Sequence, residues 1–151
     1  MNGGGVKDSG WLGSFKKLIE SEIKAVTVGV HEDETERELD PDFQTNAEIG
    51  YLHEFGLGVP QRSFLREPFD EYRQELTEKQ RLLFRSAATG RIDNSQIMPL
   101  LGETAASLLK NNIQDHIPPP LSPVTVALKN SSTPLIDSGQ LINAIDYKVE
   151  S

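Results

Sequence analysis

Apolar residues recur at helical spacing in two stretches of the first half of the chain. Between residues 10 and 22 they stand three and four positions apart, which predicts a short amphipathic helix. Residues 47–55 predict a second helix, because Thr45 and Asn46 can cap its start and Gly56 can end it. Both helices are therefore predicted with their boundaries.

The middle of the chain predicts two long helices joined by a short polar link. The first runs from Pro68 to Gly90, and the second begins near Pro99 and continues to residue 117. The apolar face of the first is expected to contain Phe69, Tyr72, Leu76, Leu83 and Ala87, and that of the second Leu101, Ala105, Leu108, Leu109, Asn112, Ile113, His116 and Ile117. Two such helices with a short connection are expected to pack as an antiparallel pair.

Strict alternation replaces helical spacing in two segments. Residues 23–30 place valines at every second position, and residues 144–149 alternate apolar and polar side chains, so both segments predict half-buried strands. Because two strands alone form a marginal sheet, we expect them to lie against the long helices or to be extended by another subunit. The predicted fold class is α+β: a small antiparallel sheet of the N-proximal and C-terminal strands, packed against a long antiparallel helix pair.

Prolines and capping residues organise the segment between the second long helix and the last strand. Pro118–Pro120 cannot continue a helix and predict a stiff corner. Ser122 and Pro123 then favour a short helix over residues 124–129, and Asp137 favours another over 138–143. We expect residues 1–10, which are rich in glycine, to form a flexible lead and residues 11–151 to form a single domain.

Composition narrows the function classes. The chain has 151 residues, of which 36% are hydrophobic and 25% charged, and no apolar run reaches the roughly 20 residues that a bilayer crossing needs. The sequence contains no cysteine, which excludes disulfides, thiolate catalysis and the common zinc fingers. We therefore expect a folded protein that is neither embedded in a membrane nor dependent on thiol chemistry.

The net charge of −8 is concentrated in one segment. Between residues 31 and 42 seven acidic residues accompany a single base, a local net charge of −6. The acidic residues are Glu32, Asp33, Glu34, Glu36, Glu38, Asp40 and Asp42. Because such a block repels itself and contains few apolar side chains, we interpret residues 31–44 as an exposed acidic loop that disfavours binding to DNA phosphates.

No catalytic, cofactor or metal constellation emerges from the residue spacing. The three histidines, His31, His53 and His116, match no metal motif, and each is readily explained as a structural side chain. Ser63 and Ser138 lack the Gly-x-Ser-x-Gly elbow of a nucleophile, and no phosphate-binding glycine loop is present. We accordingly expect no enzymatic activity, no cofactor and no metal.

A rigid, apolar loop is more informative about function than these histidines and serines. Residues 54–69, EFGLGVPQRSFLREPF, are punctuated by glycine and proline and display large apolar side chains and arginine, as protein contact surfaces do. An equally weighted alternative is that Phe64 and Leu65 fill the core of the domain itself.

Two segments resemble a known family of phage proteins. Residues 48–69, EIGYLHEFGLGVPQRSFLREPF, and residues 119–145, PPLSPVTVALKNSSTPLIDSGQLINAI, resemble the two motif regions of phage tail-completion or neck proteins, also called head-tail joining, minor tail or virion morphogenesis proteins. The matching regions of that family read A-x-I-A-x-x-x-E-F-G … P-x-R-P-F-L-R and P-L-S-P-x-T … S-S-x-P-L-I-D-T-G. Together with the first strand and the region 100–149, the likeness covers most of the chain.

The resemblance implies a structural subunit of the virion. Members of the family assemble as rings, usually hexameric, that complete the tail or join it to the capsid connector and let DNA pass. The expected partners are other copies of the chain, a tail tube or tail terminator protein and the head-tail connector proteins. The expected location is the tail or neck of the virion, and the protein itself is expected to be made in the cytoplasm of the host bacterium. Carried onto this sequence, the expected contacts with neighbouring subunits involve Phe55, Pro60, Arg62, Phe64, Leu65, Pro134 and Leu135. The other function considered is a cytoplasmic, non-enzymatic protein-binding module.

The acidic loop generates a prediction of its own. In a ring, a loop of charge −6 repeated on every subunit and facing the channel would repel the phosphates of DNA in transit. Replacing its seven acidic residues by Ser and Gln is expected to slow DNA ejection from assembled particles, measured as release over time, without changing assembly. Unchanged ejection kinetics in normally assembled particles would place the loop on the outer rim instead.

Overall fold

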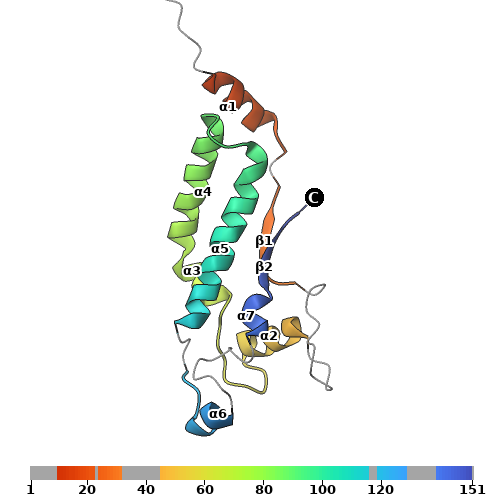
Figure 1. Cartoon of the computed structure of the whole chain (residues 1–151), viewed down its shortest axis with the longest axis vertical. Helices are drawn as coiled ribbons and strands as arrows, with labels where there is room; N and C mark the ends of the chain where they lie inside the picture. Colours follow the sequence, from red (N-terminus) through yellow and green to blue (C-terminus); the bar gives the residue numbers. More distant parts are fainter. Residues whose placement is uncertain (1–9, 23, 32–44, 116–118, 129–138, 151) are drawn as a thin grey trace, which may run out of the picture.

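Two long helices run side by side along the molecule and form its helical layer (Figure 1). They are α4 (Arg73–Ala88) and α5 (Ile97–Gln114), and they pack antiparallel as the sequence predicts. The computed structural model describes residues 10–22, 24–31, 45–115, 119–128 and 139–150. The N-terminal lead up to residue 9 and residues 32–44 of the acidic loop lie outside these described residues.

The turn between the two long helices is stabilised by caps at both ends. Gly90, at φ 73°, leaves α4 in the left-handed conformation that glycine adopts without strain. The Asp93 carboxylate then accepts a hydrogen bond from the Ser95 backbone N–H at 3.0 Å and caps the short 3-10 helix η2 (Asn94–Gln96). The second long helix, α5, begins directly after η2 at Ile97, two residues before Pro99. The sequence analysis predicts a start near Pro99.

The helix predicted to run unbroken from Pro68 to Gly90 is two helices. A short α3 (Arg66–Glu71) precedes α4, and Tyr72 between them has φ −87° and ψ 6°, outside helical geometry. The Tyr72 backbone N–H still donates to the Pro68 carbonyl at 2.8 Å, so the chain bends without losing that hydrogen bond. Helical periodicity alone could not reveal this break, because the apolar spacing continues across it.

The sheet has two antiparallel strands, as predicted. The strand β1 (Val26–Val30) pairs with β2 (Ile145–Val149), and Val28 lies opposite Tyr147. Both strands pack on α5, so the helices support a sheet that would be marginal alone. The observed β1 is shorter than the predicted 23–30, but the Glu150 N–H donates to the Ala25 carbonyl at 2.9 Å and extends the ladder by one pair.

The core lies between α5, the sheet and the segment before α3. Its centre is a buried cluster of Phe64, Ala106, Leu109, Ile113, Leu141, Ile142 and Ile145. A second cluster, Leu18, Leu83, Ala87 and Ile97, fills the space beneath α1 (Trp11–Glu20). On α5 the most buried face follows Ala105, Leu109 and Ile113, while Leu101 and Leu108 of the predicted stripe are only half-buried.

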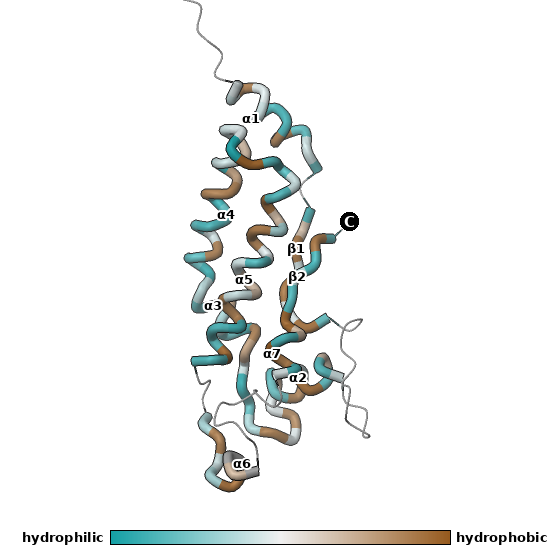
Figure 2. The backbone as a smooth tube through the Cα atoms, in the orientation of Figure 1, coloured by the Kyte–Doolittle hydropathy of each residue, from teal (hydrophilic) through white to brown (hydrophobic). Residues whose placement is uncertain are grey.

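The remaining helices occupy the ends of the molecule. Helix α1 covers one end of the long helix pair, whereas α2 (Asn46–Phe55), α6 (Pro123–Leu128) and α7 (Gln140–Asn143) lie towards the opposite end (Figure 1). Figure 2 shows hydrophobic residues in α1 and in α2 as well as in the strands and α5. Helix α7 begins at Gln140, with Gly139 as its N-cap, so it starts later than the predicted residue 138.

A close approach between α5 and the sheet depends on a glycine. A Cβ atom at Gly102 would lie 2.6 Å from the Tyr147 ring, far inside van der Waals contact. Because glycine is unfavourable within a helix, its presence in α5 reflects this contact with β2. The residue at position 102 therefore sets the distance between the two layers.

This contact can be tested by substitution. Gly102→Ala is expected to lower the free energy of unfolding by about 1–3 kcal/mol, because the added methyl displaces Tyr147. Gly13→Ala is the matched control: a Cβ there meets no atom within 4 Å, so stability should stay constant or rise by up to about 1 kcal/mol. Urea denaturation followed by circular dichroism measures both values, and equal stabilities for the two variants would contradict the close approach.

Candidate protein interaction site

Helix α2 has well-defined caps at both ends. The Glu48 N–H donates to Thr45 Oγ1 at 3.1 Å, and the Thr45 N–H donates to the Glu48 carboxylate at 2.8 Å, which together form a capping box. At the other end Gly56 has φ 70°, and a Cβ there would lie 2.9 Å from the Gln61 side chain. The predicted cap, helix and stop are all confirmed.

The buried carboxylate of Glu54 binds the segment that follows the loop. It accepts hydrogen bonds from Ser63 Oγ at 2.7 Å, from the backbone N–H groups of Phe64 and Leu65 at 2.9 and 3.0 Å, and from Arg66 Nε at 2.8 Å. The Arg66 backbone N–H adds a longer bond of 3.3 Å. We call Glu54 with residues 63–66 the Glu54 clamp. Through the single carboxylate of Glu54, this clamp holds the segment between α2 and α3 in place.

Hydrogen bonding keeps this carboxylate ionised despite its burial. Burial acts to raise the pKa of Glu54, but the hydrogen bonds from Arg66, Ser63 and the backbone of residues 65 and 66 outweigh it, so its pKa lies below the ordinary value of 4.5. The ionised clamp therefore stabilises the fold above the ordinary pKa, and this stabilisation is lost as the pH falls through the lowered value.

Arg62 binds the loop to a distant part of the chain. Its backbone N–H donates to the His53 carbonyl at 2.8 Å, and its Nε donates to the Pro119 carbonyl at 3.1 Å. The side chain is buried, and burial lowers the pKa of its guanidinium. Arg62 therefore connects the end of α2 with the segment that follows α5.

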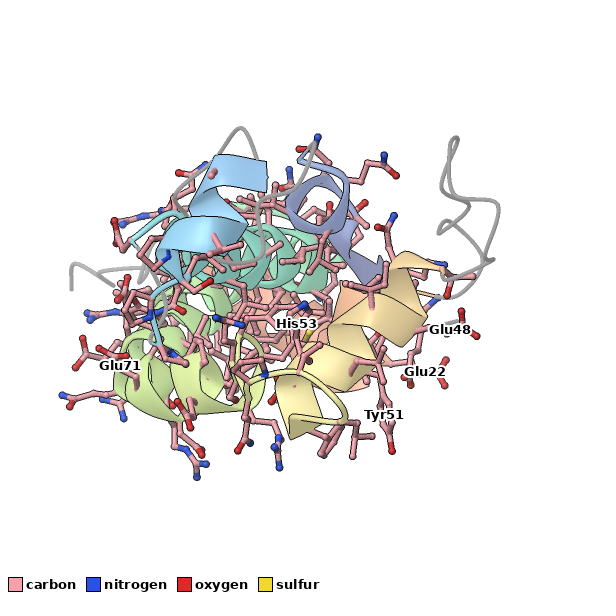
Figure 3. All side chains as sticks on the ribbon, turned by 90° about the horizontal axis from the view of Figure 1, so that it is seen from below. Glu22, Glu48, Tyr51, His53 and Glu71 are labelled. Carbon is pink, nitrogen blue, oxygen red and sulfur yellow. The ribbon has the colours of Figure 1, made fainter. Side chains whose placement is uncertain are left out.

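The clamp leaves an aromatic surface exposed at the end of α2. The Tyr51 and Phe55 rings pack in a tilted arrangement with their centroids 4.7 Å apart. The Arg66 guanidinium lies 4.5 Å from the Phe55 ring centre while its Nε binds Glu54. Leu57 follows just beyond the helix and is also exposed. We call Tyr51, Phe55 and Leu57 the α2 patch. Figure 3 shows Tyr51 and Glu48 on the outer side of α2.

The structure separates the predicted contact residues into two groups. Phe55 and Pro60 are exposed and remain available for contact. Phe64 is fully buried in the core and Arg62 nearly so, which corrects their prediction as contact residues, because neither offers accessible surface. Leu65 is half-buried and packs against the same core. The core alternative thus holds for Phe64 and largely for Leu65.

Other predicted positions lie outside the described residues. These are Pro134 and Leu135, and the acidic residues Glu32, Asp33, Glu34, Glu36, Glu38, Asp40 and Asp42.

Sequence reasoning missed the exposed Tyr51 and the clamping role of the Glu54 carboxylate. The i, i+4 spacing of Tyr51 and Phe55 on a capped helix was the available signal for the aromatic pair.

Within the part of the chain that the structure describes, no group of three or more His, Asp or Glu residues could hold a metal ion. Among the same residues, no helix has both the length and the apolarity that crossing a bilayer requires. Comparison with protein-family models, with curated proteins and with solved structures finds no match to this chain.

The clamp can be tested by removing its charge. Glu54→Gln is expected to reduce the free energy of unfolding by about 2–3 kcal/mol near pH 7, because several donors lose a charged acceptor. The deficit relative to the wild type should begin to shrink as the pH falls below about 4.5, where the carboxylate of the unfolded chain becomes protonated, and should be lost once the pH has fallen through the lowered pKa of the native carboxylate. Urea denaturation across this pH range measures the difference.

The matched control is Glu103→Gln, which removes an exposed carboxylate from α5. Its stability should follow that of the wild type at every pH. A deficit of Glu54→Gln that stayed constant down to about pH 3 would show that the lost stability does not depend on ionisation of the carboxylate.

Proposed function

We propose that this chain is a structural subunit of a phage neck or tail end, which assembles as a ring and acts by shape and contact rather than by catalysis. The ring would complete the tail or join it to the capsid connector and let DNA pass. The observation that supports this most directly is the Glu54 clamp with the aromatic surface beside it. The segment of the sequence that resembles tail-completion proteins folds into this clamp.

The physical argument concerns rigidity. A surface fixed by five hydrogen bonds to one carboxylate loses little conformational entropy when a neighbour binds it. Exposed aromatic side chains beside an arginine are the residues that most often dominate binding energy at protein interfaces. The geometry is therefore suited to repeated contact between subunits.

A groove on the helix pair favours the second candidate, a protein-binding module of the cytoplasm. It has a volume of about 340 Å³ and lies where β1 meets α3, α4 and α5. Apolar side chains line most of it, namely Val26, Val28, Phe69, Leu76, Leu101 and Ala105. Such a groove could receive an apolar segment of a separate small partner.

The two functions predict different states of the purified chain. A ring subunit is expected to form particles of several copies, alone or with tail components, by light scattering coupled to size exclusion and by negative-stain microscopy. It should also be present in purified virions. A chain that stays single at high concentration, is absent from particles and retains a small cellular partner would contradict the ring and favour the module.

A further inference from the structure

One edge of the two-stranded sheet carries backbone groups without a hydrogen-bond partner. The Glu150 N–H donates to the Ala25 carbonyl, so in the antiparallel register Thr27 also directs its backbone groups at β2. The N–H and C=O groups of Val26 and Val28 therefore point away from β2. Among the residues that the structure describes, none accepts from or donates to these groups. We call Val26 and Val28, with these unpaired groups, the β1 edge.

The opposite edge of the sheet is partly blocked by a side chain. On β2 the Tyr147 N–H also points away from the neighbouring strand, because Tyr147 lies opposite Val28. This N–H donates to the Asp146 carboxylate at 2.8 Å. A charged side chain at a strand edge discourages the addition of another strand. The β1 edge is therefore the side of the sheet that is more open to a further strand.

An apolar groove adjoins the β1 edge. It is the groove of about 340 Å³ between β1 and the helices, with Val26 and Val28 on one side and Phe69 of α3 and Leu76 of α4 on the other. No residue of β2 lines it, so the groove lies on the side of β1 away from β2. Unpaired backbone groups and apolar surface thus meet along the same strand.

The dimensions and charge of the groove select a short extended segment. Its volume is at the lower end of the roughly 300–1,000 Å³ of ligand sites, too little for a folded domain. Beyond Val28 the space narrows, because Gly29 is buried and a Cβ atom there would lie 3.9 Å from Leu65. The charged residues that line the groove, Asp70 and Arg73, pair with each other. The side chains that enter are therefore apolar and uncharged.

We infer that the β1 edge and its groove bind an extended segment of another protein, which adds a third strand to the sheet. The backbone of the segment pairs with Val26 and Val28, and every second side chain of the segment enters the groove. The inference goes beyond the proposed ring, since it needs no contact between copies. A second copy that paired through its own β1 would bring its α3 and α4 against those of the first, because these helices flank the same edge.

Hydrogen exchange measured by NMR tests directly whether the edge is open. In the free protein the amide protons of Val26 and Val28 are expected to exchange faster than that of Thr27, whose N–H faces β2. Equally slow exchange at all three in the free monomer would show that the edge is already covered, and the inference would fail. Protection that appears only as the protein concentration rises would assign the edge to a second copy, which also contradicts it.

A synthetic peptide supplies the third strand. The probe is a fluorescein-labelled peptide of about nine residues in which valine and threonine alternate between terminal lysines. Fluorescence anisotropy is expected to give a dissociation constant below about 1 mM. Bound peptide should slow exchange at Val26 and Val28 at least about tenfold. Two control peptides should not bind: one has serine in place of valine, and the other has every backbone nitrogen methylated and so has no amide donor.

Variants of the protein separate the edge from the groove. Val26→Pro removes an edge donor that makes no bond to β2, and Thr77→Arg places a charged side chain in the lining of the groove. Each should weaken peptide binding at least about tenfold. Because Thr77 is exposed, its variant should stay folded even if proline disturbs β1, which circular dichroism checks. Ser107→Arg, at an exposed position of α5 outside the groove, is the matched control and should bind as the wild type does.

Each remaining outcome has a definite meaning. Equal binding of the methylated peptide would show that apolar contact alone suffices and would overturn strand addition. Absence of binding by the alternating peptide, or unchanged binding by Thr77→Arg, would overturn it too. A chain that binds the peptide but never assembles contradicts only the proposed ring, whereas an assembled ring that binds no peptide contradicts only the added strand.

Discussion

The buried carboxylate of Glu54 determines how the middle of the chain is arranged. It accepts donors from Ser63, from the backbone of the next residues and from Arg66, so one side chain at the end of α2 fixes the start of α3. The same hydrogen bonds hold Phe64 in the core. Its ring lies so close to Gly50 that a Cβ atom at Gly50 would be 3.1 Å from it. Without these donors, burial would raise the pKa of this carboxylate above its ordinary value.

This constraint also explains the division between core and surface around α2. The clamp turns Phe64 inward and leaves Phe55 outward, with Arg66 joining the two sides through its bonds to Glu54 and its position over the Phe55 ring. The buried guanidinium of Arg62 connects the same loop to Pro119. The exposed aromatic surface is therefore part of a rigid unit that several distant segments stabilise together.

Rigid positioning and exposed apolar surface suit the proposed role in protein contact. Helix α1, with its exposed Trp11, Leu12, Phe15 and Ile19, lies at one end of the α4–α5 pair, and α2 lies towards the other end. The contact of Gly102 with Tyr147 in turn keeps the sheet close to α5. The proposed ring assembly would thus depend on interactions far from the exposed surfaces.

Local signals in the sequence determined the elements and the fold class. Thr45 and Gly56 marked the ends of α2, alternation indicated both strands, and helical periodicity on either side of a short polar link indicated the helix pair. Only the tertiary structure decided that Phe64 and Arg62 are buried while Tyr51 is exposed, and that the helix breaks at Tyr72. Caps and periodicity act between near neighbours, whereas burial depends on contacts between segments that are distant in the sequence, which residue pattern alone does not specify.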